Sequence, residues 1–286
     1  MRSDRSVTRR QLVAEGAAAL AAAGVGAPGR EALWLWSDLL GEAPVAAALD
    51  HGPGSVEPEH VISYAAAIAR RAAGEPFAHV SGWAGFRHLT LRSDRRALIP
   101  RPETEGLVDL VLARAPTGRV ADVGTGSGCI ALSLATEGRY DQVLAIDHSA
   151  EALQLADENR RRTGGRVELL RGDLCEALRP GSLDALVSNP PYLTAGEYGI
   201  LDASVRDWEP ERALVGGPDG LETIARLCIS AHAVVRPGGW LALEIDSGRA
   251  ALCAERAGAS GWTDVAIHAD LFGRERYLLA RRSDAR

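Results

Sequence analysis

Lysine is absent from this chain of 286 residues, so arginine carries all of its positive charge. Acidic side chains still outnumber basic ones, and the net charge of −6 argues against a large nucleic-acid-binding surface. No apolar run is long enough to cross a membrane as a helix. We therefore expect a globular protein without direct nucleic-acid or membrane partners, and the length favours two domains over one.

Metal-binding and redox motifs are also missing. The four cysteines are widely spaced and form no Cys-x-x-Cys pair, and the seven histidines contain no His-x-x-x-His spacing. We therefore predict no metal. Reduced thiols that pack as small apolar side chains would suit a cytoplasmic protein.

Two adjacent arginines, Arg9 and Arg10, resemble the start of a twin-arginine export signal. However, Glu15 interrupts the apolar region that such a signal needs, and this region is mostly alanine. The pattern favours an Ala-rich amphipathic helix that ends at Gly24 or Gly26. We accordingly predict a cytoplasmic location and, by default, a monomer.

The character of the chain changes twice along its length. Apolar segments of helical length predict a helical domain over residues 1–75, with helices at 12–23, 31–40 and 56–73. Residues 77–80 and 87–91 flank a Gly-rich turn, which predicts a β-hairpin linker over 76–95. The remaining residues, 96–286, then form a second, larger domain.

Two tryptophans stand out in the helical region. Trp34 and Trp36 lie two positions apart, so they cannot share one face of a helix. We expect one of them to pack inward, while the other faces the second domain or a partner.

Short apolar segments alternate with helical ones after residue 118. Strands are predicted at 119–123, 142–146, 167–171, 183–188, 240–245, 264–268 and 276–280. Apolar strands separated by helices predict an α/β fold with a mainly parallel, doubly wound sheet of seven strands. The last two strands leave no room for a helix between them, so we expect an antiparallel edge hairpin.

A glycine-rich loop, Asp-Val-Gly-Thr-Gly-Ser-Gly at residues 122–128, follows the first predicted strand. Glycine lets the backbone turn sharply and approach a ligand, and ligands in such sheets bind beyond the carboxyl ends of the strands. A dinucleotide fingerprint, Gly-x-Gly-x-x-Gly, would need a glycine where Cys129 stands. The spacing favours S-adenosylmethionine, with predicted contacts from Gly124, Thr125, Gly126, Ser127 and Gly128.

Acidic residues follow the next two strands. Asp147 ends the second strand, where a carboxylate can accept hydrogen bonds from both ribose hydroxyls; the alternative is a role in capping the following helix. Asp173 follows the third strand and could meet the adenine amino group, although a cap or loop role competes. Leu174 could pack on the adenine face.

The sequence Asn-Pro-Pro-Tyr follows the fourth predicted strand, so it emerges at the same sheet edge as the glycine loop. Consecutive prolines have a fixed φ and no N–H, which gives a stiff loop with free carbonyl acceptors. Together with the glycine loop, this motif suggests methyl transfer from S-adenosylmethionine to a planar amide or amine nitrogen. An amide nitrogen is a poor nucleophile, so the site must orient it and accept its N–H protons. The side-chain oxygen of Asn189 and the carbonyl oxygen of Pro190 can both accept these protons. The ring of the tyrosine can pack on a planar substrate group. The predicted catalytic residues are therefore Asn189, Pro190, Pro191 and Tyr192.

A rigid segment with two prolines, residues 99–105, leads into a helix. Thr104 is a candidate N-cap for this helix, because threonine hydroxyls accept hydrogen bonds from the first free N–H groups. Arg101 and Glu103 either line the substrate site or tie this segment to the catalytic domain.

Together these motifs resemble the peptide chain release factor glutamine methyltransferase family, over nearly the whole chain. The resemblance is carried by residues 99–105, 122–128, 187–192, 209–210, 213–221, 236–240 and 270–276. It implies a class I, Rossmann-like methyltransferase domain behind a five-helix N-terminal domain and a hairpin linker. It also implies methylation of the glutamine in the Gly-Gly-Gln motif of bacterial peptide chain release factors. Asn189 would then serve both the glutamine amide and S-adenosylmethionine.

Three alternatives stay open on the sequence. One is the sister enzyme that methylates a glutamine of a ribosomal protein, although its proline-arginine segment usually lacks the Glu-Thr-Glu found here. Another is a nucleic-acid adenine methyltransferase, which would want a basic groove. A third is a catalytically silent protein that binds S-adenosylmethionine. Two departures from the family pattern are Asp246, where relatives usually carry glycine, and the helix around Trp34 and Trp36.

Overall fold

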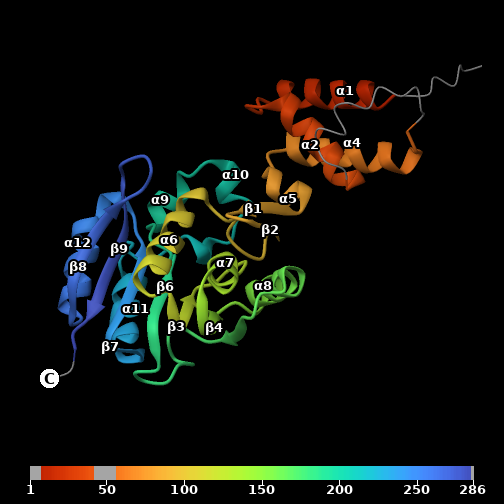
Figure 1. Cartoon of the computed structure of the whole chain (residues 1–286). Coiled ribbons are helices and arrows are strands. Elements are labelled where there is room, and N and C mark those ends of the chain that lie inside the picture. Colours follow the sequence, from red (N-terminus) through yellow and green to blue (C-terminus); the bar gives the residue numbers. More distant parts are fainter. Residues whose placement is uncertain (1–7, 42–55, 285–286) are drawn as a thin grey trace, which may run out of the picture. The chain divides into compact units, whose positions relative to one another are not determined.

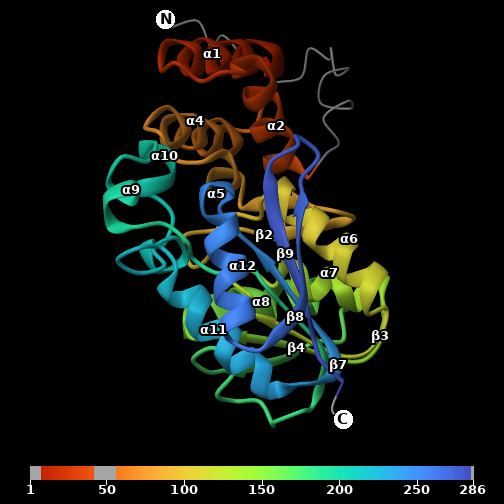
Figure 2. The same cartoon turned by 90° about the vertical axis from the view of Figure 1, so that its left-hand side faces the viewer.

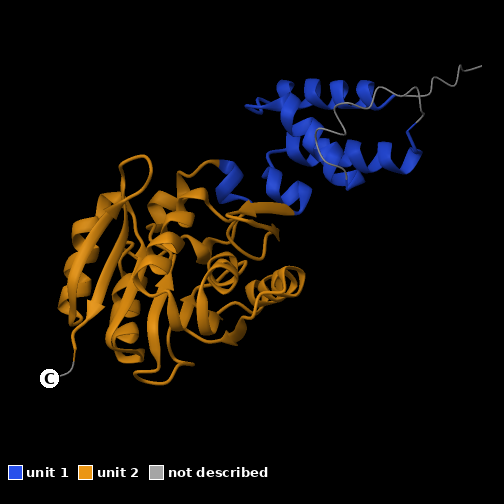
Figure 3. Ribbon diagram, in the orientation of Figure 1, with its two compact units in different colours: residues 1–82, 203–208 blue, residues 83–202, 209–286 orange. Residues whose placement is uncertain are grey.

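The computed structural model describes residues 8–41 and 56–284 (Figure 1). The chain divides into two compact units, coloured separately in Figure 3. Unit 1 comprises residues 1–82 and 203–208, and unit 2 comprises residues 83–202 and 209–286. No helix in the described ranges has both the length and the apolar character needed to span a bilayer.

Unit 1 is helical where it is described. Its helices are α1 (Arg9–Ala22), α2 (Pro28–Leu40), α4 (Pro58–Ala72), α5 (Phe77–Ser81) and α10 (Ala203–Arg206). The three helices predicted from apolar periodicity are confirmed. The Thr8 hydroxyl accepts from the Gln11 N–H and so caps α1, and the Gln11 side-chain oxygen accepts in turn from the Thr8 N–H. This capping box explains why a helix begins at the two arginines.

The core of unit 1 forms around a buried aromatic pair. Trp36 is buried and meets Tyr64 edge-on, with ring centroids 5.2 Å apart. The Tyr64 hydroxyl donates to the Ala32 carbonyl at 3.0 Å. A Cβ atom at Gly16 would lie only 2.4 Å from that hydroxyl, so α1 needs glycine there. Trp34, in contrast, is exposed, which confirms that one of the two tryptophans packs inward.

The β-hairpin exists, but the predicted strand at residues 77–80 is wrong. This segment is α5, which follows Pro76 and ends at Gly82 in the left-handed conformation. The hairpin is built instead from β1 (Trp83–Phe86) and β2 (Leu89–Arg92), so the expected turn glycine Gly85 lies within a strand. The turn falls at Arg87, whose φ is +51°. A non-glycine residue with positive φ carries little sequence signal.

Unit 2 contains a seven-stranded sheet in the order β5-β4-β3-β6-β7-β9-β8. The strands are β3 (Thr117–Val123), β4 (Arg139–Asp147), β5 (Glu168–Arg171), β6 (Leu183–Ser188), β7 (Val235–Glu244), β8 (Trp262–Ala269) and β9 (Glu275–Arg282). The first five run parallel to one another, and β9 pairs antiparallel with both β7 and β8. All seven predicted strands and the antiparallel edge hairpin are confirmed.

Helices cover both faces of this sheet (Figures 1 and 2). The longer ones are α6 (Glu105–Arg114), α7 (Cys129–Glu137), α8 (Ala150–Thr163), α11 (Glu222–Val234) and α12 (Ala250–Ala259). The apolar residues of α6 and α7 pack on one face of the sheet, and those of α11 and α12 pack on the other. The remaining segments are α9 (Ala195–Gly199) and the 3-10 turns η1 (Pro102–Thr104), η2 (Glu211–Ala213) and η3 (Ser247–Arg249).

Sheet topology determines where a ligand can bind. The chain runs outward from β3 in one direction to β4 and β5, and later in the other direction to β6 and β7. This reversal opens a crevice beyond the carboxyl ends of β3, β4 and β6. The glycine loop, Asp147 and the Asn-Pro-Pro-Tyr loop all follow these ends, so the fold brings the predicted site residues to one edge.

Candidate active site

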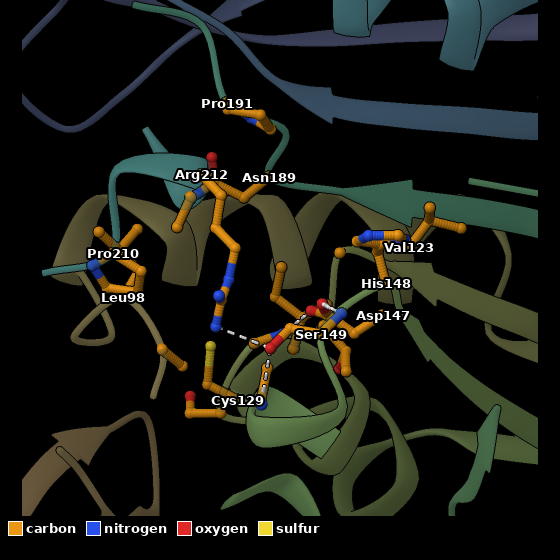
Figure 4. A pocket seen from close by; sticks show the side chains of 18 of the residues that line it. Leu98, Val123, Cys129, Asp147, His148, Ser149, Asn189, Pro191, Pro210 and Arg212 are labelled. Carbon is orange, nitrogen blue, oxygen red and sulfur yellow. Dashed lines mark hydrogen bonds between the residues drawn. The ribbon is translucent and has the colours of Figure 1, made fainter. Parts of the chain in front are cut away.

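A cavity of about 350 Å³ lies at this edge of unit 2 (Figure 4). Its volume is within the range of pockets for small molecules and cofactors. The predicted residues that line it are Arg101, Gly124, Thr125, Gly126, Ser127, Asp147, Asp173, Leu174, Asn189 and Pro191. Among the described residues, Gly128, Glu103, Pro190 and Tyr192 do not belong to this lining. The cavity therefore joins the proposed cofactor loop to the start of the Asn-Pro-Pro-Tyr loop.

Asp147 connects the glycine loop to the next helix. Its Oδ2 accepts a hydrogen bond from the Gly126 N–H at 2.9 Å, and its Oδ1 accepts one from the Ser149 N–H at 2.8 Å. The N-cap of α8 is Ser149, whose hydroxyl accepts from the Ala152 N–H. Each carboxylate oxygen keeps a second lone pair, so Asp147 can hold the loop and still accept from ribose hydroxyls.

Backbone hydrogen bonds of the glycine loop oppose a pyrophosphate ligand. The N–H groups of Gly124 and Thr125 both donate to the Ile146 carbonyl, and the Gly128 N–H donates to Thr125. The Gly126 N–H is taken by Asp147. A phosphate-binding loop presents free N–H groups to its anion. Here four of them are already used within the protein, which agrees with the spacing argument for S-adenosylmethionine.

Asp122, which opens the motif at residues 122–128 and still belongs to β3, is fully buried. Its Oδ2 accepts from the Thr125 hydroxyl at 2.6 Å and from the Ala131 N–H at 3.2 Å. Its Oδ1 has no hydrogen-bond partner within the described part of the chain. Burial raises the pKa of Asp122 to about 7, and the nearby Asp147 charge acts in the same direction. Asp122 therefore holds the loop and the start of α7 through its hydrogen bonds. Its burial disfavours the charged form of its carboxyl group.

Replacing Asp122 with asparagine should stabilise the protein at alkaline pH. The pKa of Asp122 rises from 3.8 to about 7 on folding. The free energy of unfolding therefore falls as the pH increases between these two values. Asparagine keeps an acceptor without a charge, and the variant should gain on the order of 1–4 kcal/mol at pH 8 and much less at pH 4. Denaturant unfolding at both pH values measures this. A gain that does not depend on pH, or an equal gain in the exposed control Asp141→Asn, would contradict the assignment.

The adenine end is predicted at Asp173 and Leu174, which both line the cavity. Asp173 forms an ion pair with Arg226, which belongs to α11 and also lines the cavity. Leu174 adopts a φ of +48°, a conformation that non-glycine residues rarely adopt without a constraint from their surroundings. The ion pair leaves acceptor capacity on the Asp173 carboxylate, which can accept several hydrogen bonds.

The Asn-Pro-Pro-Tyr loop is attached to the glycine loop and to a segment further along the chain. The Ser188 hydroxyl, at the end of β6, donates to the Val123 carbonyl at the end of β3 at 2.6 Å. On the other side, the Gly216 N–H donates to the Leu193 carbonyl at 2.8 Å. A Cβ atom at Gly216 would lie 2.2 Å from the Pro191 oxygen, and one at Gly220 would lie 2.3 Å from the Tyr192 oxygen. Both glycines are therefore required for the close approach.

Gly216→Ala should reduce turnover without loss of cofactor affinity. The added methyl would displace the Pro191 carbonyl, and a shift of about 1 Å in a positioning group can lower kcat by about 10²-fold. Asp147 and the glycine loop are untouched, so the dissociation constant for S-adenosylhomocysteine should stay the same in calorimetry. Gly196→Ala is the matched control, because its Cβ would meet only Thr194 Oγ1 at 3.9 Å. Unchanged kcat in Gly216→Ala would show that the loop tolerates this displacement.

Two predictions for the segment before α6 resolve differently. Arg101 pairs with the buried carboxylate of Glu209, which also accepts from the Ile99 N–H at 3.0 Å. The segment is thus tied to residues more than a hundred positions away, while Arg101 still lines the cavity. Thr104 occupies the N-cap position of α6 as predicted, but its side chain makes no capping hydrogen bond. Its hydroxyl donates instead to the carboxylate of Glu244.

Known proteins match both parts of the chain. The family model described as the PrmC N-terminal domain matches residues 11–82, and the methyltransferase small domain matches residues 103–206. A release factor glutamine methyltransferase of Deinococcus radiodurans is 40% identical, covering 96% of this chain and 98% of that protein. The enzyme of the same name from Moorella thermoacetica is 41% identical, covering 97% and 100%.

The chain belongs to the release factor glutamine methyltransferase family. The relative from Cereibacter sphaeroides agrees, at 39% identity over 92% of this chain and 94% of its own. Among solved structures, a methyltransferase from Pyrococcus furiosus superimposes with a TM-score of 0.52 at 21% identity, covering 68% of this chain and 88% of that one, which supports the fold. The protein is a methyltransferase whose cofactor is S-adenosylmethionine.

Sequence reasoning missed three arginines that line this cavity, Arg96, Arg212 and Arg226. Arg212, in η2, lines the cavity and extends toward Ser149 (Figure 4). It donates to the Ser149 hydroxyl and to the Glu151 carboxylate, both at 2.8 Å. The sequence signal for Arg212 was its position between the family motifs at residues 209–210 and 213–221. Arg212 therefore links the segment after the Asn-Pro-Pro-Tyr loop to the N-terminus of α8.

The loop after β7 in this methyltransferase accommodates its unusual aspartate. Asp246 has a φ of −73°, which any residue can adopt, and its Oδ1 accepts from the Gly248 N–H at 3.2 Å. Its Oδ2 accepts from Arg249, which also binds Glu197. The departure from glycine thus adds a hydrogen-bonded turn at this position.

Proposed function

We propose that this protein methylates the side-chain amide nitrogen of the glutamine in the Gly-Gly-Gln motif of bacterial peptide chain release factors. The observation that carries the proposal is the placement of Asn189 and Pro191 in the same cavity as the glycine loop and Asp147. That cavity brings an amide-binding loop to a cofactor site. Relatives of about 40% identity over nearly their full length are named for this activity.

The donor set of the cavity suits S-adenosylmethionine. Asp147 would accept from the ribose, Asp173 and Leu174 would meet the adenine, and the residues of the glycine loop would bound the rest. Bound there, the cofactor supplies an electrophilic methyl group on its sulfonium. The chain's own contribution is to hold the glutamine nitrogen in line with that methyl, and such positioning can provide about 7–11 kcal/mol of the barrier reduction.

The Asn-Pro-Pro-Tyr loop would bind the glutamine amide through its oxygens. The amide presents two N–H donors, which the Asn189 side-chain oxygen and the Pro190 carbonyl can accept. Neither proline can donate, and their fixed φ keeps these acceptors in place. Burial raises the pKa of Tyr192, so its phenol stays protonated at neutral pH. Tyr192 is therefore no general base, and the product can lose its proton after transfer. The proposed role of Tyr192 is to pack on the planar amide group of the substrate.

We further propose that Arg101 and Glu103 brace the substrate side of the site. The helical domain, residues 1–75 as predicted from the sequence, would recognise the release factor, and the exposed Trp34 is the candidate contact. The protein would act as a cytoplasmic monomer without binding nucleic acid directly.

Mass spectrometry of the substrate peptide tests this function. The full chain is incubated with isotopically labelled S-adenosylmethionine and a purified bacterial release factor, and the Gly-Gly-Gln peptide is sequenced. One methyl group on the glutamine nitrogen is the expected result. A release factor with asparagine in place of that glutamine is the control and should stay unlabelled. Transfer to a ribosomal protein or to DNA, with none to the release factor, would overturn the substrate.

A further inference from the structure

Three polar side chains from different elements meet behind the Asn-Pro-Pro-Tyr loop. Thr104 directly precedes α6, Asn189 follows β6, and Glu244 ends the neighbouring strand β7. Asn189 Nδ2 lies 3.2 Å from Thr104 Oγ1, which lies 2.7 Å from Glu244 Oε2. Thr104 and Glu244 are each 2% exposed. The hydrogen bond between Thr104 and Glu244 is thus shielded from water and must be satisfied within the protein, whereas Asn189 and Thr104 both line the cavity.

The hydrogen bonds that link Asn189, Thr104 and Glu244, called the row below, can run in only one direction while Glu244 is ionised. An ionised carboxylate only accepts hydrogen bonds, so the single hydroxyl proton of Thr104 is donated to Glu244. Thr104 can then only accept from its other neighbour. Asn189 must therefore turn its NH2 group toward Thr104, which leaves its amide oxygen on the opposite branch of the side chain. Because Asn189 lines the cavity, this oxygen is the atom available to a bound substrate.

We propose that Thr104 and Glu244 are positioning residues that select the amide orientation of Asn189. The inference rests on the proposed function, in which Asn189 accepts an N–H of the glutamine amide. An asparagine with the reverse orientation would set its own NH2 against the substrate NH2, two donors facing each other. The pair Thr104–Glu244 prevents this, and it gives the Glu-Thr-Glu sequence at residues 103–105 a role in the reaction that a helix cap would not provide.

Protonation of Glu244 would reverse the row. Burial raises the pKa of Glu244, while the Thr104 hydroxyl, Arg276 and Arg101 lower it and Glu103 raises it. A protonated Glu244 could donate to Thr104, whose proton would then be free for the Asn189 oxygen. We therefore expect turnover to fall as the pH drops through the pKa of Glu244. The other titratable groups that interact with Glu244 are Cys129, Tyr192 and Tyr277.

Isosteric substitutions separate positioning from folding. Thr104→Val and Glu244→Met remove the hydroxyl and the acceptor, and each should lower kcat by about 10–10²-fold. The dissociation constant for S-adenosylhomocysteine should change by less than about 3-fold, because the groups assigned to the cofactor remain. Thr104→Ser keeps the hydroxyl and should retain turnover. Glu244→Gln can present either amide atom to Thr104, so it should show reduced turnover and lose the acidic limb of the pH profile.

The double variant Thr104→Val with Glu244→Met tests whether the two residues act as one unit. Its kcat should be no lower than that of the worse single variant, because either change already breaks the row. Multiplied losses would show that the two side chains act independently, which would overturn the proposal. Equal losses in Thr104→Val and Thr104→Ser would overturn it as well, since only packing would then be at stake.

Nitrogen-15 labelling of asparagine reports on the row without any substrate. The chain has only two asparagines, Asn159 and Asn189. The Asn159 amide donates to the Ser127 and Arg92 carbonyls and serves as the internal control. Exchange of the Asn189 side-chain N–H protons with solvent should accelerate in Thr104→Val and Glu244→Met but not in Thr104→Ser, while Asn159 stays unchanged. Unaltered exchange of the Asn189 protons in the variants would overturn the positioning proposal even if the wild-type protein methylates the release factor. If the exchange changes as expected but the wild-type protein does not methylate the release factor, only the proposed function fails.

Discussion

Asn189→Ala is expected to lower kcat by about 10²–10³-fold, the range observed when one preorganised hydrogen-bonding group is removed from an active site. The alanine side chain cannot accept the substrate N–H, and the glutamine nitrogen would lose its alignment. The fold should persist, because Asn189 donates only to Thr104 among the hydrogen bonds identified for its side chain. Single-turnover methylation of a release factor at saturating S-adenosylmethionine measures the effect.

The control for this substitution removes an amide elsewhere. Gln154 is exposed on α8, and Gln154→Ala should leave methylation unchanged. Binding of the release factor to Asn189→Ala is not informative alone, because docking can use surfaces far from the reacting nitrogen. Methylation of normal rate and extent by Asn189→Ala would remove the catalytic assignment, whatever its effect on affinity.

The strand ends of the catalytic unit could be predicted because their signals are local. Alternating apolar strands and helices predicted β3, β4 and β6, and the rule that ligands bind at the carboxyl ends of such strands predicted which residues meet. The predicted strand at 240–245 was too short, since β7 begins at Val235 and passes through two glycines and a proline. These residues disfavour strands in isolation, and none of the three has a register partner on β6 or β9, where the pairing resumes at Trp240. Gly238 even adopts a φ of +77°.

Contacts between distant segments were not predictable from the sequence. Thr104 carries every local sign of an N-cap, and its true partner Glu244 lies 140 residues away. Arg101 and Glu209 are likewise separated by 108 residues. A side chain that can satisfy its hydrogen bond locally or across the sheet takes whichever partner the packing brings near. Periodicity and propensity report only the local option, so the sequence indicated the right residues with the wrong partners.

Asp147→Ala should weaken cofactor binding more than any other single change outside the catalytic loop. The carboxylate would lose both ribose hydrogen bonds, and bonds to a charged group contribute about 1.5–3 kcal/mol each, so the dissociation constant should rise at least about 10²-fold. Loss of the bonds to the Gly126 and Ser149 N–H groups would loosen the loop further. Calorimetry with S-adenosylhomocysteine measures the effect directly.

Asp147→Asn provides a graded comparison, and Asp141 provides the matched control. Asparagine keeps one acceptor oxygen, so its affinity should lie between those of the wild type and the alanine variant. Asp141 is exposed near the start of the same strand, far along β4 from the cavity, and Asp141→Ala should bind normally. If kcat at saturating cofactor fell in Asp147→Ala while the affinity stayed the same, the carboxylate would act on the substrate side of the site. Because Asp147 already accepts from two backbone N–H groups, its geometry instead favours an effect on affinity, with turnover at saturation largely restored.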